Sequence, residues 1–366
     1  MQSSDDILIC NAGSSSLKLA RWNTHNDSFD PVNYEGSFED LEKALQRYLQ
    51  ENLPCSAALH RIVHGGDSDE RPHKITKDVR ERIEHWQVVA PQHNAIALSL
   101  IALVQSEWCN AENFALFDSA LYAHLPEVSR GYALPENLSS KWPIRRYGFH
   151  GLAHRAQWAL LTQNKVYEKV ITLQLGSGCS ASAWLNGEVV DTTMGFSPLE
   201  GLPMATRCGN IDASVVLHLL QYEDGHTTSS LRRLLSEHSG LKGLSGISGD
   251  IRKLMDSDDE SATRAINHFC YQIQKTIGSY IAVLGGVDAI TFGGGIGENQ
   301  DAIRHKILSP LKNLSIVLDE DKNSRPSGFT ALHDSSSQTE LWLTPVDEIR
   351  QMARQFNALA KGQEKI

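Results

Sequence analysis

The stretch that decides the fold is Ile7–Lys18, which reads I-L-I-C-N-A-G-S-S-S-L-K. Its apolar start predicts a buried strand, and the small residues that follow leave backbone N–H groups open to an anion. Lys18 adds a positive charge after the turn. Taken alone, the stretch indicates either a phosphate-binding loop or an ordinary Gly/Ser turn between two strands.

The same pattern returns in the second half of the chain, at Ile171–Trp184, as I-T-L-Q-L-G-S-G-C-S-A-S-A-W. A third glycine-rich segment, Gly293–Asn299, follows the predicted strand Asp288–Phe292 and is expected to form an open loop. It lacks G-K-[ST], so it is not a Walker P-loop. Two similar strand-turn-strand units predict a duplicated α/β fold that holds a nucleotide between its halves.

Composition limits the possible functions. The 366 residues suffice for about two domains, and 41% hydrophobic and 21% charged residues are typical of a globular protein. A net charge of −10 argues against nucleic-acid binding, and no apolar run reaches the roughly 18 residues of a membrane span. The six cysteines form no C-x-x-C pair, and the first strand starts too early for a signal peptide. A cytoplasmic protein is expected.

Arg61 is the most unusual residue of the first half, because it lies inside the apolar strand predicted at Ala58–Val63. A buried arginine needs an anionic partner, and either a structural carboxylate or a ligand would serve. His60 and His64 flank it, and without a third ligand nearby they are expected to be structural rather than metal-binding. The sequence therefore predicts an anion next to Arg61.

Three further segments carry chemistry-bearing residues. Asp118 follows the predicted strand Asn113–Phe117, where a carboxylate either binds a metal, takes part in catalysis or caps the next segment. Arg145–His154 holds two arginines and two histidines in ten residues, which favours a site contribution. Arg207 lies in a glycine-containing loop, where a plain surface arginine is the alternative.

Helices are predicted from apolar spacing at Phe38–Glu51, Asp78–Val89, Asn94–Cys109, Arg155–Leu161, Ala213–Gln221, Ser229–Ser236, Asp250–Asp256, Ala262–Leu284 and from about Asp347. His93 and Asn94 stand at the start of the third of these helices, where Asn94 is expected to cap it. A helix N-terminus also favours bound anions.

The ordered motifs resemble the acetate and propionate kinases of the acetokinase family. They span Asn11–Asn299, nearly the whole chain, and read N-A-G-S-S-S-L-K, H-R-I-V-H-G-G, A-P-x-H-N, F-D-S-A, R-R-Y-G-F-H-G-L-A-H, D-T-T-M-G-F-S-P-L-E-G, T-R-x-G-x-I-D and F-G-G-G-I-G-E-N. The resemblance implies the duplicated two-domain fold of the sugar kinase, Hsp70 and actin superfamily. It also implies reversible phosphoryl transfer between ATP and a short carboxylate, giving an acyl phosphate and ADP.

The resemblance also assigns roles to the unusual residues. Arg61 and Arg207 would bind the carboxylate and the transferring phosphoryl group through their planar guanidinium forks. His150 would donate a hydrogen bond to the phosphoryl group in the transition state. Asp118 would be the catalytic acidic residue, and it would align the site rather than abstract a proton, because a carboxylate substrate is already ionised.

The remaining assignments concern metal, nucleotide and acyl group. Asn11 and Glu348 would hold Mg²⁺, with Mn²⁺ as an alternative. The acyl pocket and its surroundings would comprise Arg61, Val63, Gln92, His93, Phe149 and Pro198. The nucleotide side would comprise Ser14, Ser16, Lys18, Gln174, Gly176, Ser177, Gly178, Asp250, Ile251, Arg252, Gly294, Gly295, Ile296, Gly297 and Asn299.

The chain departs from the family pattern at three places. The second phosphate loop of the family reads H-L-G-N-G, whereas this chain has Gln174 and Ser177 at the histidine and asparagine positions. Gln92 replaces a leucine of the acyl pocket, and T-P-V-D-E leaves the metal ligand open between Asp347 and Glu348. The alternatives are therefore pyrophosphate as donor, a more polar acid, or a non-catalytic nucleotide-binding regulator.

The expected domains are an N-terminal one, residues 1–119 with 350–366, and a C-terminal one, residues 120–349, for nucleotide binding and dimerisation. The resemblance implies a homodimer that binds a small carboxylate and a nucleotide, and neither nucleic acid nor a membrane.

Overall fold

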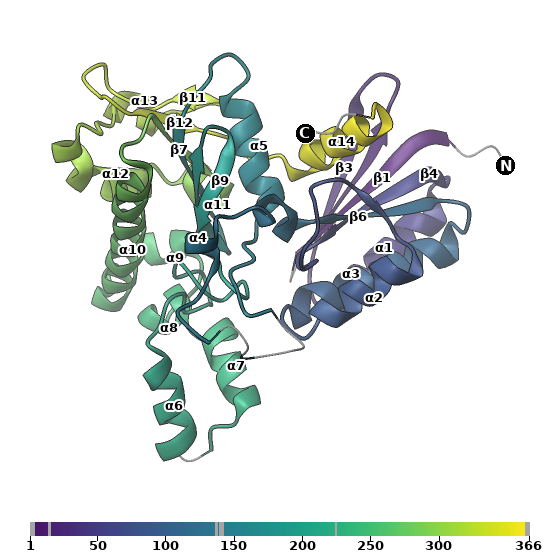
Figure 1. Ribbon diagram of the computed structural model, residues 1–366, viewed down its shortest axis with the longest axis horizontal. Helices are drawn as coiled ribbons and strands as arrows, with labels where there is room; N and C mark the ends of the chain where they lie inside the picture. The colour runs from purple at the N-terminus through teal and green to yellow at the C-terminus, as the bar shows by residue number, and fades with distance from the viewer. Residues whose placement is uncertain (1–3, 14–15, 136–137, 139–142, 224, 363–366) are drawn as a thin grey trace. The chain divides into compact units, whose positions relative to one another are not determined.

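The computed structural model describes residues 4–13, 16–135, 138, 143–223 and 225–362 (Figure 1), and the side chains of residues 4, 5 and 92 are outside the description. The chain divides into two compact units. Unit 1 comprises residues 1–123, 149–155 and 347–366, and unit 2 comprises residues 124–148 and 156–346. Unit 1 thus includes 120–123, 149–155 and 347–349, which were predicted to belong to the second domain. Among the described residues, no helix is both long and apolar enough to cross a membrane.

Unit 1 is built on a six-stranded sheet of order β3-β2-β1-β4-β6-β5. Its elements are β1 Ser4–Ala12, β2 Ser16–Asn23, β3 Ser28–Glu35, α1 Phe38–Glu51, β4 Cys55–Ile62, β5 His73–Lys74, α2 Lys77–Trp86, α3 Pro91–Glu107, β6 Glu112–Phe117, η1 Asp118–Tyr122 and α14 Glu348–Ala360. Strands β1, β4 and β6 are parallel, whereas β2, β3 and β5 run antiparallel to their neighbours. The predicted hairpin and the helix Phe38–Glu51 are confirmed.

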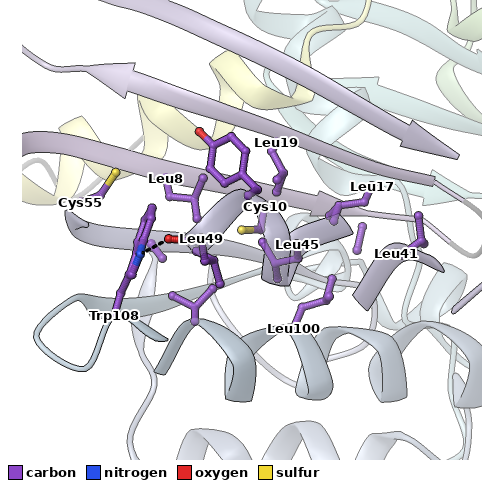
Figure 2. Close-up of a cluster of buried hydrophobic side chains, with 14 of the residues drawn as sticks. Leu8, Cys10, Leu17, Leu19, Leu41, Leu45, Leu49, Cys55, Leu100 and Trp108 are labelled. Carbon is purple, nitrogen blue, oxygen red and sulfur yellow. Dashed lines mark hydrogen bonds between the residues drawn. The ribbon is translucent and has the colours of Figure 1, made fainter. Parts of the chain in front are cut away.

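Both faces of this sheet are buried, which explains the unbroken apolar run of β1. Leu8 and Cys10 point to one face, where they pack with α1 and α3 (Figure 2). Ile7 and Ile9 point to the other face, where Met352 of α14 covers them. A strand covered on both sides reads as continuously hydrophobic. The polar residues that follow such a run therefore lie at the edge of a rigid sheet.

Unit 2 is built on a second six-stranded sheet, of order β11-β12-β10-β7-β8-β9. Its elements are α4 Glu127–Arg130, β7 Lys169–Leu175, β8 Cys179–Leu185, β9 Glu188–Thr192, α6 Ala213–Tyr222, α7 Thr228–Glu237, α8 Gly240–Ser245, α9 Ile251–Met255, α10 Glu260–Leu284, β10 Ala289–Gly293, α11 Gly294–Asn299, α12 Asp301–Leu308, η2 Ser309–Leu314, α13 Glu320–Ser324, β11 Thr330–Ala331 and β12 Glu340–Leu343. Helix α5, Gly151–Leu161, begins in unit 1 and ends in unit 2.

The two sheets have the same topology, which confirms the predicted duplication. Three antiparallel strands, β3-β2-β1 in one sheet and β9-β8-β7 in the other, are followed by two parallel strands and a short antiparallel edge strand. Each central hairpin turns at a Gly/Ser loop, after the pair Ala12–Leu17 in β1-β2 and after Leu175–Cys179 in β7-β8. The fold is therefore α/β with an internal repeat.

Two local predictions are wrong. Helix α3 begins at Pro91, so His93 and Asn94 lie in its first turn, and Asn94 does not cap it. Proline at the first helical position needs no partner for its nitrogen, and this lets the helix start earlier. The segment Gly294–Asn299 is the short helix α11 rather than an open loop. Gly294, at φ +79°, makes the turn out of β10 that lets this helix start at once.

Candidate active site

The centre of unit 1's candidate site is the Arg61 guanidinium, next to the carboxyl ends of β1, β4 and β6. Its Nε and Nη2 donate to Oδ2 of Asp118 at 3.0 and 2.6 Å. Its Nη1 donates to Oδ1 of Asn11 at 3.1 Å, and Nη2 lies 3.7 Å from Oε1 of Glu348. The anion that the sequence requires beside Arg61 is thus a carboxylate of the chain. The ends of adjacent parallel strands bring these residues together.

Burial makes this charge cluster sensitive to its composition. The Asp118 side chain is 1% exposed and that of Arg61 is 11% exposed. Burial lowers the pKa of Arg61, but Asp118 and Glu348 outweigh burial, so its pKa is raised and the guanidinium stays charged. Burial raises the pKa of Asp118, and Arg61 opposes that rise. One cation facing two carboxylates leaves acceptor oxygens for a second cation.

Glu348, rather than Asp347, belongs to this cluster. Nδ2 of Asn11 donates to Oε2 of Glu348 at 2.7 Å. Asp347 instead caps α14, where its carboxylate accepts the backbone N–H of Arg350 at 2.9 Å. Of the two neighbouring carboxylates, Glu348 is therefore the one that contacts Asn11.

His150 is held next to Asp118 by a strained backbone and a close packing contact. Its φ is +61°, a left-handed conformation that non-glycine residues adopt rarely and mostly under constraint. The next residue, Gly151, packs so tightly that a Cβ there would lie 2.1 Å from the carbonyl oxygen of Asp118. The N–H of Leu152 donates to Oδ1 of Asp118 at 3.4 Å. The start of α5 is thereby fixed against the carboxylate.

Buried rings surround the predicted acyl-pocket residues of unit 1. Val63 and Phe149 are both buried, and the carbonyl of Phe149 accepts from Tyr122 at 2.9 Å. His64 stacks on Trp86 at 4.2 Å and meets Phe149 edge-on at 5.1 Å. These buried side chains are apolar and aromatic, which is the environment that a small acyl group would need.

The other pocket residues of unit 1 lie on α3. His93 is half-buried in the first turn of the helix. Gln92 precedes it in the same turn, and its side chain is outside the described part of the structure.

The histidines beside Arg61 hydrogen-bond to neighbouring protein groups. His60 is buried, Nε2 contacts Oδ1 of Asn113 at 2.8 Å, and burial lowers its pKa to about 4. The Nδ1 of His64 accepts the N–H of Gly66 at 3.1 Å. Within the described ranges, no group of three or more His, Cys, Asp and Glu side chains could hold a metal ion.

The first Gly/Ser loop connects β1 and β2, and its two described ends, Gly13 and Ser16, are in contact. The N–H of Gly13 donates to the carbonyl of Ser16 at 2.8 Å. Ser14 lies outside the described residues. Ser16 is half-buried at the start of β2, and Lys18 is exposed and pairs with Asn11 across the hairpin. The Ile7–Lys18 stretch is thus a hairpin whose first strand carries Asn11 into the charge cluster.

In unit 2, the second Gly/Ser loop gathers the other predicted segments around it. The N–H of Gly176 donates to the carbonyl of Gly178 at 3.1 Å, and the carbonyl of Ser177 accepts from Ala205 at 3.1 Å. A Cβ on Gly294 would lie 2.6 Å from the carbonyl oxygen of Leu175, so α11 starts directly on this loop. Small residues therefore leave backbone groups and little side-chain bulk at this edge.

Arg207 lies two residues after Ala205 in the same loop of unit 2. Its Nη1 donates to the carbonyl of Pro198 at 3.1 Å, so two predicted site residues are in direct contact. The sequence reading of a plain surface arginine does not hold, because Arg207 is half-buried. Arg207 and Pro198 are thus positioned on the loop that adjoins the Gly/Ser turn.

The remaining predicted nucleotide residues border the same segments. A Cβ on Gly249 would lie 2.7 Å from the carbonyl oxygen of Ala205. The next residue, Asp250, therefore lies close to the loop that contains Ala205. Asp250 caps α9 and pairs with Arg252 at 2.8 Å, while Ile251 is buried. In α11, Gly294, Ile296 and Gly297 are buried, whereas Gly295 and Asn299 are exposed, and Asn299 donates to the carbonyl of Gly295 at 2.9 Å.

Three residues that support the site were not predicted from the sequence. Gly151 fits against Asp118, and Glu298 accepts the N–H groups of Gly294 at 2.8 Å and Val346 at 3.1 Å. The amide of Gln157 contacts that of Gln174 at 3.4 Å. Gly151 lies inside the motif R-R-Y-G-F-H-G-L-A-H and Glu298 inside F-G-G-G-I-G-E-N, so the sequence carried a signal for both. Gln157 lies in an ordinary helix pattern and gave none.

Comparisons with known proteins agree with this geometry. The family model described as "Acetokinase family" matches residues 32–354. An acetate kinase of Rhodopseudomonas palustris strain TIE-1 is 36% identical, covering 98% of this chain and 99% of the relative. Among solved structures, a propionate kinase from Francisella tularensis has a TM-score of 0.86 at 31% identity, covering 97% and 99% of the two chains. The acetate kinase of Porphyromonas gingivalis has a TM-score of 0.84 at 28% identity, covering 97% and 100%. The chain belongs to the acetokinase family.

Proposed function

We propose that this protein transfers a phosphoryl group reversibly between ATP and a short-chain carboxylate, acetate first and propionate next. The observation that carries the proposal is the buried Arg61 guanidinium, held by Asp118 and Asn11 at the end of three parallel strands. Phosphoryl transfer needs positioning and charge neutralisation rather than covalent help, and a fixed guanidinium supplies both.

The reaction is an in-line displacement at the γ-phosphorus. A substrate carboxylate oxygen forms the new P–O bond, the bond to the leaving oxygen of ADP breaks, and no proton needs to move, because the carboxylate is ionised. Arg61 binds the substrate carboxylate or the phosphoryl oxygens. Asp118 fixes the guanidinium through two hydrogen bonds rather than acting as a base.

Two more groups would stabilise the charge that spreads over the phosphoryl oxygens. His150 precedes α5 in a left-handed backbone conformation, and the next residue, Gly151, packs against the carbonyl of Asp118. Arg207 is offered by the loop next to the second Gly/Ser turn. Hydrogen-bond donors already fixed in place act without reorganisation as the charge develops.

Asn11 and Glu348 are suited to Mg²⁺, with Mn²⁺ as an alternative. Mg²⁺ prefers oxygen ligands and is commonly bound by one or two carboxylates together with substrate phosphates and water. Glu348 supplies a carboxylate and Asn11 an amide oxygen within one hydrogen-bonded pair. When bound, the ion neutralises phosphate charge.

The nucleotide is assigned to unit 2. The loop Gly176–Gly178, the start of α11 and the Asp250–Arg252 turn meet around backbone groups with little side-chain bulk, which suits phosphates and a purine nucleoside. Val63, Gln92, Phe149 and Pro198, with His93 nearby, are assigned to the acyl group.

We also propose a homodimer in the cytoplasm. Helix α6 has no buried residue, and its apolar side chains Val215, Leu217, Leu220 and Tyr222 are exposed. Such a face is typical of an association surface. The cysteines are all free thiols, which fits a reducing compartment.

The test is acetyl phosphate formation from acetate, ATP and Mg²⁺. Arg61→Ala should reduce the rate by about 100-fold or more. Arg155→Ala is the matched control, because Arg155 is also nearly buried, at 13% exposed, and paired with Glu70 in unit 1. Equal rates for Arg61→Ala and the wild type would refute the assignment.

The same assay separates the alternatives. Pyrophosphate replacing ATP tests the altered second loop, and an acid panel run with Gln92→Leu tests the acyl pocket. If Gln92 lines that pocket, the variant should favour more apolar acids. Nucleotide binding without turnover of any acid would favour the non-catalytic regulator.

A further inference from the structure

A hydrogen-bonded network of neutral side chains lies next to the second Gly/Ser loop, and no sequence motif predicts it. Gln157 of α5 is fully buried. Its Oε1 accepts the hydroxyls of Thr291 at 2.7 Å and Thr344 at 3.1 Å, and its Nε2 lies 3.4 Å from Oε1 of Gln174. Gln174 is the position where the acetokinase pattern has a histidine.

The threonines fix which way the Gln157 amide faces. Thr344 has a second acceptor, the carbonyl of Phe292 at 3.3 Å. Thr291 has only Gln157 among the described residues, and its side chain is fully buried. Turning the Gln157 amide over would leave the Thr291 hydroxyl proton without an acceptor, and leaving a buried donor unpaired is unfavourable.

The orientation of the Gln157 amide also determines the orientation of the Gln174 amide. Because Nε2 of Gln157 faces Gln174, the carbonyl oxygen of Gln174 must accept there, and its NH₂ group points the other way. A Cβ on Gly294 would lie 2.9 Å from that Nε2, so the NH₂ group lies at the start of α11, beside the Gly/Ser loop. Among the residues described, no acceptor takes its protons.

We propose that Gln157 is a positioning residue that holds the Gln174 amide with its NH₂ group toward a nucleotide phosphate. This inference rests on the proposed function, because it assumes that the second loop meets the phosphates. A histidine at this position changes charge with pH, whereas an oriented amide is a donor at every pH. The chain thus keeps a phosphate donor at this loop without a titrating group.

The test is ADP binding, measured by calorimetry between pH 5 and 8 and expressed relative to the wild type at each pH. In Gln157→Glu, the ionised carboxylate only accepts, so Gln174 must turn its NH₂ group inward and present its oxygen to the phosphate. ADP affinity should fall about 10–100-fold at pH 8. It should recover at low pH, where the protonated carboxyl again donates to Gln174, and burial brings that titration into range.

Two further variants complete the design. Gln157→Met removes the orientation without reversing it, so ADP binding should weaken about two- to tenfold with no added pH dependence. Thr172→Val is the matched control, because it deletes a buried hydroxyl, bonded to Trp184 at 2.9 Å, from the same strand as Gln174. It should leave ADP affinity unchanged.

Unchanged ADP affinity in Gln157→Glu overturns the proposal, as does an equal, pH-independent loss in the Glu and Met variants or an equal loss in Thr172→Val. If wild type binds ADP but forms no acyl phosphate, the proposed function fails while the Gln157 titration still decides the inference.

Discussion

The two halves of this protein place different chemistry at the same point of the same topology. Asn11 of β1 and Gln174 of β7 each stand one residue before the last pair of their hairpins. Around Asn11 the side chains are charged, with Arg61, Asp118 and Glu348 in one cluster. Gln174 itself meets only neutral groups among the described residues, the amide of Gln157 and Gly294, whereas the charged Glu298 and Arg207 lie on the adjoining segments.

The difference suggests that the two halves of the duplicated fold have different roles in the reaction. Under the proposed function, the charged cluster around Arg61 would supply fixed charges to the transferring group, where charge changes during the reaction. The second Gly/Ser loop, with its backbone groups, would bind phosphates that keep their charge. Four predictions follow from this contrast, ordered by the size of the expected effect.

The largest effect concerns the buried charges of unit 1. Arg61→Leu leaves Asp118 without its partner and should lower the free energy of unfolding of unit 1 by about 3–5 kcal/mol. The double variant Arg61→Leu/Asp118→Leu should regain most of this loss, although activity should not return. In the neutral network, Thr291→Val should cost only about 1 kcal/mol.

Hydrogen–deuterium exchange of peptides from β1 and β4, compared with β7 and β10, measures each unit separately. If Arg61→Leu and Thr291→Val lowered the free energy of unfolding by similar amounts, the charged cluster of unit 1 and the neutral network of unit 2 would not differ in energetic importance.

The second effect is acid sensitivity. Burial lowers the pKa of His60 to about 4 and of His154 to about 3, and both lie in unit 1. The unfolded chain therefore binds more protons than the folded one below about pH 6.5, so unit 1 loses stability as the pH falls toward these values. At pH 5, where both histidines are still largely neutral in the folded protein, the loss is about 2 kcal/mol per histidine. No described histidine of unit 2 is buried.

Exchange at pH 7 and pH 5 should therefore show β1 and β4 becoming less protected than β7 and β10. A His60→Gln variant keeps a polar side chain but cannot titrate, and it should flatten part of this response. Greater acid sensitivity in unit 2 would contradict the prediction.

The third effect uses glycines to separate turnover from nucleotide affinity. Gly151→Ala pushes against the carbonyl of Asp118, so it should lower kcat with little change in the ADP dissociation constant. Gly294→Ala pushes against Leu175 at a φ of +79°, so it should mainly weaken ADP binding. Each substitution should also destabilise the fold by about 1–3 kcal/mol.

Gly278→Ala in α10 is the control, because nothing lies within 4 Å of the added methyl group, and a helical alanine should stabilise by up to about 1 kcal/mol. If Gly151→Ala and Gly294→Ala changed kcat and the ADP dissociation constant to the same extent, the two halves would not have separate roles.

Much of this fold was predictable because its signals are local. The helix Phe38–Glu51 was predicted to the residue from its apolar spacing, and the structure adds a Ser37 cap at its start. Both Gly/Ser hairpins follow from apolar runs broken by small residues. Three strands were missed. Strand β3 is mostly polar and contains Pro31, so it lacks the apolar alternation of a strand. Strands β5 and β11 have two residues each, which is too short to show a hydrophobic period.

The candidate site was predictable only in kind. Arg61 in an apolar strand requires an anion, but its partner Asp118 lies 57 residues away and is brought close by parallel pairing. Asn94 shows the opposite failure, because a good capping residue instead bonds within the core, to the backbone of His64 and Ile83. Contacts such as that between Gln157 and Gln174 depend on packing between elements, which no local pattern encodes.

The central claim is that the cluster around Arg61 in unit 1 is needed for turnover and that the loop around Gln174 in unit 2 binds the nucleotide. An ADP titration of Arg61→Lys and Gln174→Ala tests it most directly, with acetyl phosphate formation assayed on the same samples. We predict that Gln174→Ala weakens ADP binding about tenfold. Arg61→Lys should change it by less than about twofold while turnover falls about 100-fold. Equal weakening of ADP binding in both variants, or full turnover in Arg61→Lys, would contradict the account.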